Sequence, residues 1–346
     1  AARWCARSMN APPSASPIAP AALAEATANA LGRGPAGSLR IEPLAGAGSD
    51  RTYWRIVWPG ASTCLACWHE GQRPENDHFA ALARLLEARG VRVPRILGEA
   101  PADRLLWVED LGDTTLFVHA RSNPPESLPA YRAAVAELAR FHAIAPANLS
   151  PEEISHLQPP FDEALYRWEQ DYFLDHFGMR HSGLPASQVE RARAHPALVA
   201  LAARLAALPR RLVHRDFQSQ NILLLPEGRA ALVDFQGMRL GRPEYDLASL
   251  VHDPYTDLDT QTAASVVAAY RDATGRPDAA PDDLLCACAQ QRLMQALGAY
   301  CNLADNAGKT QYLRFIAPAR ARLRALVAGD ALEEALGPLL EASPPG

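Results

Sequence analysis

The chain has 346 residues, enough for one large domain or two ordinary ones, and its 34 basic and 39 acidic residues leave a net charge of −5. No long run of either sign occurs, so the composition argues against a nucleic-acid-binding surface. No apolar stretch approaches the roughly 18 residues that a membrane span needs. The six cysteines show neither a disulfide framework nor the spacing of a four-ligand metal site. We therefore expect a cytoplasmic protein without nucleic-acid or membrane partners.

The first 38 residues are rich in Ala, Pro and Ser. Residues 1–22 contain no acidic side chain, a feature that transit peptides share. We expect residues 1–38 to form a disordered N-terminal extension and assign no function to them.

Residues 39–112 have mainly the pattern of strands. Runs rich in β-branched and aromatic residues predict strands at 41–44, 53–58, 63–69, 96–98 and 105–108. Between the third and fourth of these, residues 75–89 carry apolar side chains at helical spacing. We expect this region to form a small antiparallel sheet that carries one helix.

A glycine-containing turn joins the first two predicted strands. Gly46 and Gly48 would let backbone N–H groups approach phosphate oxygens without a side-chain clash. Ser49 and Arg51 add further donors. Two glycines at this spacing also occur in ordinary hairpins, so the turn alone does not decide its function. Its place ahead of the motif at 214–221 favours a loop that binds nucleotide phosphates.

The pattern becomes helical after residue 112. Helices are predicted over 128–145, 161–178 and 186–207, and again from the end of the hairpin described below to the C-terminus. This change predicts an α+β protein with two lobes. The small antiparallel sheet at 39–112 is the N-lobe, the larger helical part at 113–346 is the C-lobe, and a functional cleft lies between them.

The most specific pattern runs from His214 to Asn221 and continues at Asp234. Residues 222–225 and 230–233 are two apolar runs typical of buried strands, and the Glu-Gly pair between them suits a hairpin turn. Symmetric pairing about that turn places Asn221 directly opposite Asp234. The Cα atoms of such partners lie roughly 4.5–5.5 Å apart, so an amide oxygen and a carboxylate could share one cation.

These residue types suit phosphoryl transfer, which needs positioning and charge neutralisation more than covalent catalysis. Mg²⁺ prefers oxygen ligands and keeps part of its water shell, so Asn221 and Asp234 suffice alongside nucleotide phosphates. Asp216 would accept the proton of the attacking hydroxyl. The competing interpretation is a loop in which His214 and Asp216 only hydrogen-bond the backbone, and the spacing of the whole motif argues against it.

The segment resembles the His-x-Asp-x-x-x-x-Asn catalytic loop and the metal-binding aspartate of kinase-like phosphotransferases, especially the aminoglycoside phosphotransferase family. Phe235 and Gln236 follow Asp234, where protein kinases have Phe-Gly. The resemblance implies a two-lobed protein-kinase-like fold, with ATP as the phosphoryl donor and Mg²⁺ as the cofactor. It also implies that His214 and Asp246 support the catalytic loop, although Asp246 equally suits a helix cap.

The resemblance further implies which groups would bind the nucleotide. Glu109 and Leu111 lie in the hinge segment whose backbone faces adenine in the family, although the segment could be an ordinary strand end. Kinases usually hold the phosphates with a lysine on the third strand, and Trp68 stands at that position here. Arg51, Arg55 or Arg73 would have to supply the charge.

The substrate is less clearly indicated. Acidic and aromatic residues mix over 161–177, and His-Asp-Pro-Tyr follows at 252–255. Aromatic faces and carboxylates suit a sugar, so Glu169 and Asp253 are substrate candidates, with a core helix that has a solvated acidic side as the alternative. These stretches resemble the anomeric kinases of N-acetylmuramate and N-acetylglucosamine, a cell-wall-recycling branch of the superfamily.

The sequence therefore favours an ATP- and Mg²⁺-dependent kinase that phosphorylates a hydroxyl of a small molecule, with an amino sugar such as N-acetylmuramate or N-acetylglucosamine as the expected substrate. Phosphorylation of an aminoglycoside or another small alcohol is the alternative within this class, although the acid excess is only moderate for holding a polycation. The absent strand lysine motivates an alternative from another class, a non-catalytic nucleotide-binding pseudokinase.

Overall fold

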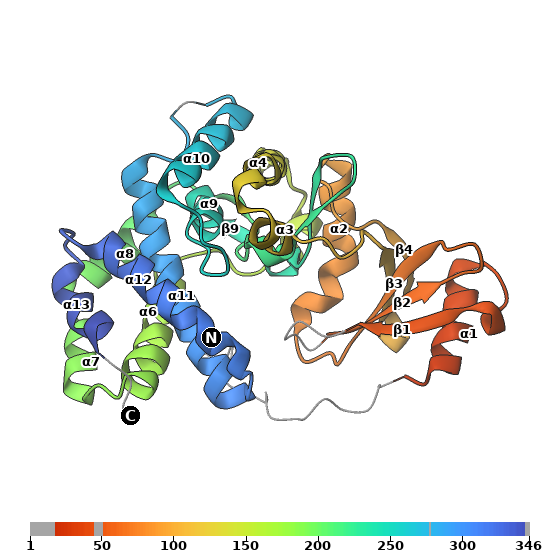
Figure 1. The fold of residues 1–346 in the computed structure, drawn as a ribbon, viewed down its shortest axis with the longest axis horizontal. Coiled ribbons are helices and arrows are strands. Elements are labelled where there is room, and N and C mark those ends of the chain that lie inside the picture. Colours follow the sequence, from red (N-terminus) through yellow and green to blue (C-terminus); the bar gives the residue numbers. More distant parts are fainter. Residues whose placement is uncertain (1–17, 45–50, 277, 343–346) are drawn as a thin grey trace.

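A computed structural model describes residues 18–44, 51–276 and 278–342. Figure 1 shows a small sheet at one end and a larger body of helices at the other, which is the predicted α+β arrangement in two lobes. Within the described ranges, no helix is both long enough and apolar enough to cross a membrane.

The N-lobe is built on a five-stranded antiparallel sheet with strand order β1-β2-β3-β5-β4. Because side chains alternate along a strand, its two faces differ in character. Trp54, Ala66 and Trp107 pack together on the outer face, while the inner face turns toward the helical lobe. The strands are β1 Arg40–Leu44, β2 Arg51–Val57, β3 Thr63–His69, β4 Ile96–Ala100 and β5 Leu105–Glu109.

Helix α1 (Pro20–Leu31) covers the outer face of the sheet and corrects one expectation. It begins with Pro20 at its first turn and ends at Gly32, whose positive φ of 60° suits glycine. Its Leu23 is fully buried, and Trp107 Nε1 donates to Thr27 Oγ1 at 2.9 Å. The prediction of disorder is therefore wrong for residues 20–31, while residues 1–17 lie outside the described part of the chain.

The C-lobe consists of helices around the catalytic hairpin. The helix predicted over 186–207 is interrupted before Pro196, because proline has no N–H for a helix interior and starts a new helix instead. The helix predicted at 161–178 continues from α6 into a π-helical segment, Leu174–His181. The helix of the N-lobe is α2 Phe79–Ala88, within the range 75–89 expected for it. The helices of the C-lobe are α3 Leu116–Ser122, α4 Leu128–His142, α5 Pro151–Ser155, α6 Glu163–Phe173, α7 Ala186–Arg193, α8 Pro196–Ala207, α9 Pro243–Val251, α10 Thr260–Thr274, α11 Asp282–Ala307, α12 Ile316–Val327 and α13 Glu333–Glu341.

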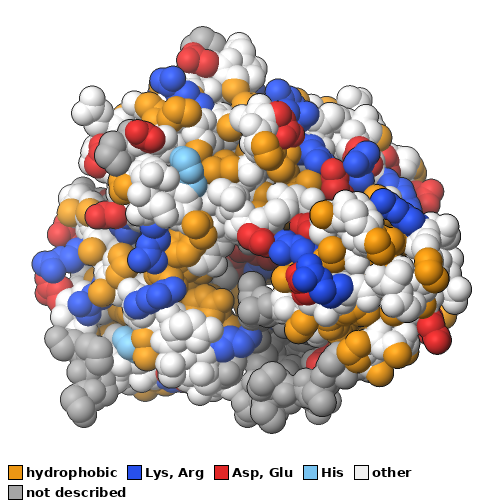
Figure 2. Space-filling model, turned by 45° about the vertical axis from the view of Figure 1, so that its right-hand side comes forward, with side chains coloured by type: hydrophobic (Ala, Val, Ile, Leu, Met, Phe, Trp, Pro, Cys, Tyr) orange, Lys and Arg blue, Asp and Glu red, His pale blue; other side chains and the backbone are white. Residues whose placement is uncertain are grey.

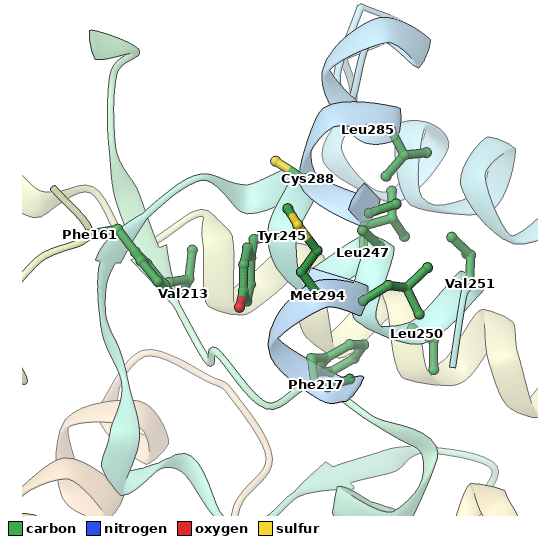
Figure 3. Packing of buried hydrophobic residues seen from close by; sticks show 14 of the residues in the cluster. Phe161, Val213, Phe217, Tyr245, Leu247, Leu250, Val251, Leu285, Cys288 and Met294 are labelled. Carbon is green, nitrogen blue, oxygen red and sulfur yellow. The ribbon is translucent and has the colours of Figure 1, made fainter. Parts of the chain in front are cut away.

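The C-lobe core lies directly beneath the catalytic motif. Figure 3 shows Phe217, from that motif, packing with Leu250 of α9 and Met294 of α11. All three side chains are fully buried. The loop that carries Asp216 is thus anchored by an apolar side chain in a close-packed interior, which limits its freedom to move.

Candidate active site

The catalytic hairpin forms as predicted, but its register differs by one residue. Strands β7 (Ile222–Leu224) and β8 (Ala230–Leu232) pair with Ile222 opposite Leu232. The loop has three residues, 226–228, because Leu225 N–H donates to Arg229 O at 2.9 Å and Gly228 takes a φ of 78°. Asn221 therefore faces Val233 and not Asp234, and Val233 N–H donates to Asn221 O at 3.0 Å.

Asp234 leaves the strand in a left-handed conformation, with a φ of 65°. This turn at the strand end redirects its side chain toward the N-lobe, where it forms an ion pair with Arg51 of β2. Gln236 Nε2 also donates to Asp234 Oδ1 at 2.8 Å. Although burial alone would raise it, these partners lower the pKa of Asp234 below its ordinary value, so the carboxylate is ionised at neutral pH.

The side chain of Asp216 is 30% exposed. Arg292 Nη2 of α11 donates to its Oδ1 at 3.2 Å, and Arg215 Nη1 lies 3.5 Å from its Oδ2. The backbone carbonyl of Asp216 accepts from Asn221 Nδ2 at 2.9 Å, which fixes the amide relative to the loop. Two arginine contacts thus hold the carboxylate of Asp216, which still keeps contact with solvent.

Asp246 supports the catalytic loop from inside the C-lobe. Its Oδ2 accepts from His214 N–H at 2.7 Å, and its Oδ1 accepts from Arg215 N–H at 2.8 Å. His142 Nε2 lies 3.0 Å from Oδ2, while its Nδ1 lies 2.8 Å from Tyr270 Oη. Helix α9 has no side-chain cap, so Asp246 holds the loop and does not act as the helix-capping residue that the sequence also allowed.

The family implies a Mg²⁺ ion, and the residues present fit one. Asn221 donates through Nδ2, which leaves its amide oxygen as the remaining ligand atom. The hydrogen bonds that Asp234 accepts from the described residues use Oδ1, so Oδ2 keeps its lone pairs for a metal ion. No group of three or more His, Cys, Asp or Glu forms a complete metal site within the described ranges, so an ion here would take further ligands from phosphates and water.

The inner face of β2 and β3 carries the residues that would meet the nucleotide. Trp68 packs against the outer cluster beneath α1, so it does not occupy the position expected of a phosphate-binding lysine. Cys67, its neighbour, is on the inner face opposite Tyr53. The inner-face cation that reaches the catalytic hairpin is Arg51, through its ion pair with Asp234.

Arg55 has a different task from the phosphate binding that the sequence suggested. Its Nε donates to Asp110 Oδ2 at 2.6 Å, and its Nη2 donates to Asp113 Oδ1 at 2.7 Å. Both carboxylates belong to the segment that joins the two lobes. Arg55 therefore ties β2 to this segment, and its charge is already matched by two acids.

The two hinge residues, Glu109 and Leu111, differ in whether their backbone groups are free to hydrogen-bond a nucleotide. The Glu109 side chain pairs with Arg92 at 2.8 Å and Arg95 at 3.2 Å, and its N–H donates to Arg95 O at 2.9 Å. The backbone of Leu111 forms no hydrogen bond with the described residues. Leu111 is thus the better placed of the two to meet an adenine ring, while Gly46, Gly48 and Ser49 fall outside the described residues.

The two acidic substrate candidates are buried and serve the fold. Glu169 is 1% exposed and accepts from Tyr245 Oη and Gln291 Nε2, each at 3.1 Å. Asp253 is also 1% exposed and accepts from Ser219 N–H at 2.8 Å. Burial raises the pKa of each above its ordinary value. Both carboxylates are buried and already hydrogen-bonded within the fold, which argues against the substrate roles expected from the sequence.

The sequence interpretation missed Arg239 and Arg292, which lie near Asp216 and are 7% and 5% exposed. Arg292 does carry a signal, since it is a single charge in a long run of small and apolar residues on α11. Figure 2 shows a recess between the lobes with acidic and basic side chains at its rim.

Comparisons with known proteins agree with this geometry. The sequence profile of the phosphotransferase enzyme family matches residues 40–282. An N-acetylmuramate/N-acetylglucosamine kinase of Pseudomonas aeruginosa is 27% identical over 88% of this chain and 88% of its own length. The kinase of the same name from Caulobacter vibrioides is 27% identical over 69% of this chain and 67% of its own length.

Solved structures show the fold. A spectinomycin phosphotransferase bound to ADP and spectinomycin has a TM-score of 0.64 at 12% identity. The match covers 94% of this chain and 100% of that protein. A choline/ethanolamine kinase family protein from Mesorhizobium loti has a TM-score of 0.60 at 19% identity. The match covers 87% of this chain and 92% of that protein. With its protein-kinase-like fold and its small-molecule kinase relatives, the chain belongs to the phosphotransferase enzyme family.

Proposed function

We propose that this phosphotransferase uses ATP and Mg²⁺ to phosphorylate a hydroxyl of an amino sugar, N-acetylmuramate or N-acetylglucosamine. The relatives that span most of the chain carry that activity in their names. The observation that carries the proposal is the association of Asp216, Asn221 and Asp234 on one loop and hairpin. It supplies a base and two oxygen ligands within a single rigid unit.

Asp216 is the general base in this account. As the acceptor oxygen forms its bond to the γ-phosphorus, Asp216 takes the hydroxyl proton, and the bond from the γ-phosphorus to the β,γ-bridging oxygen breaks to release ADP. The contact from Arg292 Nη2, at 3.2 Å, orients Asp216 Oδ1 before the acceptor arrives. Oδ2 is then the oxygen that faces the hydroxyl.

Asn221 and Asp234 would hold Mg²⁺, whose charge offsets that of the nucleotide phosphates when bound. Arg51 supplies the cation that the third strand lacks, since it already reaches Asp234 across the cleft. Gly46, Gly48 and Ser49 would cover the phosphates, and Leu111 would meet adenine. Arg51 is 9% exposed, so little water surrounds its charge. Its attraction to a bound phosphate is therefore stronger than it would be in open solvent.

A coupled ADP-release screen tests this proposal over N-acetylmuramate, N-acetylglucosamine, glucose, choline and kanamycin. We expect ADP release with one or both N-acetylated amino sugars and little with the other acceptors. Release with kanamycin or choline alone would contradict the amino-sugar assignment. No release with any acceptor, together with measurable nucleotide binding, would favour a non-catalytic nucleotide-binding protein.

A further inference from the structure

Three arginines from distant segments converge beside Asp216. Arg215 belongs to the catalytic loop, Arg239 to strand β9 (Arg239–Gly241) and Arg292 to α11. Arg215 and Arg292 contact Asp216 directly, at 3.5 and 3.2 Å. Arg239 interacts electrostatically with Arg215, Glu169 and Asp216. The three guanidinium groups therefore form one basic cluster beside the base.

Arg239 is the member of this cluster that forms no ion pair with the described residues. It is 7% exposed, yet no carboxylate of the described residues lies within 4.0 Å, the ion-pair limit. Its hydrogen bond within the described ranges joins Nε to Gly237 O at 3.3 Å, and its guanidinium lies 5.2 Å from the centre of the Phe161 ring. Its Nη atoms form no hydrogen bond there and keep some solvent contact.

Such an arrangement is costly for the fold. A buried charge normally requires a partner, and a second arginine nearby makes the cost larger. Burial and the charge of Arg215 lower the pKa of Arg239 to about 10, because both disfavour the charged form. The group is still charged at neutral pH. A fold that retains this charge so close to its catalytic base has a ready site for an anion.

Glu169 does not form an ion pair with Arg239. It is buried and accepts hydrogen bonds from Tyr245 and Gln291. The guanidinium of Arg239 therefore keeps N–H donors that an anion could use. A buried cation with such donors beside the base disfavours a polycationic acceptor and favours one with an acidic group.

We propose that Arg239, together with Arg215, binds a carboxylate carried by the acceptor, so that the enzyme prefers an acidic amino sugar to its neutral counterpart. This inference rests on the proposed function. N-Acetylmuramate carries a lactyl carboxylate that N-acetylglucosamine lacks. Arginine suits the task because its planar fork can donate two parallel hydrogen bonds to a carboxylate.

The test compares kcat/KM for N-acetylmuramate, its lactyl methyl ester and N-acetylglucosamine. The ester retains the size of the acid but has no charge. We expect the wild-type enzyme to prefer the acid to the ester by about tenfold or more, since a charge-assisted hydrogen bond is worth about 1.5–3 kcal/mol. In Arg239→Gln this preference should fall toward one, and Arg239→Lys should restore part of it. Arg191→Gln, an exposed arginine on α7, is the matched control.

Thermal unfolding separates binding from a structural role. Because Arg239 has no carboxylate partner in the described part of the chain, Arg239→Gln should leave the melting temperature unchanged or raise it. A lower melting temperature with an unchanged acid-to-ester ratio would overturn the proposal, as would a wild-type ratio near one. A rate with N-acetylglucosamine that rises when free lactate is added would show an independent anion site instead. Inactivity toward all three sugars would contradict the proposed function itself.

Discussion

The guanidinium of Arg51 and the carboxylate of Asp234 form an ion pair that spans the two lobes. Arg51 begins β2 in the N-lobe, and Asp234 follows β8 in the C-lobe. The position that would hold Mg²⁺ is therefore already in contact with the strand that would hold the phosphates.

Replacing Arg51 tests this relationship. Arg51→Gln should weaken binding of ADP with Mg²⁺ by about tenfold, because one charge-assisted contact to phosphate is lost. Isothermal titration calorimetry measures this, and Arg40→Gln is a control, since Arg40 is an exposed arginine of the same sheet that pairs with Glu42. Tighter nucleotide binding in Arg51→Gln would mean that the ion pair competes with the nucleotide and does not assist it.

Asp246 should matter more to the catalytic loop than its distance from the cleft suggests. Asp246→Asn places an amide donor against the N–H groups of His214 and Arg215, so we expect a loss of about 2–3 kcal/mol in unfolding free energy and a lower kcat. Tyr270→Phe removes only the outer contact to His142 and should cost about 1 kcal/mol. Chemical denaturation and steady-state kinetics compare the two. Equal effects in both variants would show that Asp246 does not brace the loop.

Helix α1 provides a prediction about stability alone. Thr27→Val leaves the buried indole N–H of Trp107 without an acceptor, which should cost about 1–3 kcal/mol. Asn29→Ala, at an exposed position of the same helix, should have little effect. Urea denaturation of both variants checks this. If Thr27→Val were as stable as the wild type, the helix would not dock on the sheet as described.

The lowered pKa of His252 leads us to expect that the free energy of unfolding depends on pH. Burial, with a contribution from Arg322, lowers the pKa of His252 to about 4, whereas an unfolded histidine titrates near pH 6.5. Above pH 6.5 it is neutral in both states. Below that, only the unfolded chain takes up the proton, so stability falls until about pH 4 and then levels off.

The corresponding loss is about 3 kcal/mol between pH 6.5 and 4. His252→Gln should show a smaller decline in that window. Melting temperatures across the pH range measure this difference. Parallel curves for His252→Gln and the wild type would remove His252 as the cause.

Much of this architecture can be predicted because its signals are local. The strands of the N-lobe show in their composition, and the spacing of Asp216, Asn221 and Asp234 is readable in one short stretch. The register of the hairpin could not be predicted, because loops of three and of four residues both fit the same turn sequence. A single hydrogen bond, from Leu225 N–H to Arg229 O, decides between them.

Other features depend on tertiary contacts that no local pattern contains. Glu169 lies in a stretch of mixed acidic and aromatic residues that suits a sugar. In the structure it is instead buried, where it accepts hydrogen bonds from Tyr245 and Gln291. Arg239 and Arg292 meet Asp216 only after three distant segments pack together. Helix α1 was missed because its alanine-rich sequence gains its order from the tryptophan-lined sheet it covers.

The central claim is that Asp216 takes the proton of the acceptor hydroxyl, and Asp216→Asn tests it most directly. Asparagine keeps the shape of the side chain but cannot act as the base. Measured with N-acetylmuramate and saturating Mg²⁺ and ATP, kcat should fall by about 10²-fold or more, while the dissociation constant for ADP with Mg²⁺ stays within about threefold of the wild type. An Asp216→Asn enzyme with undiminished kcat would contradict the account.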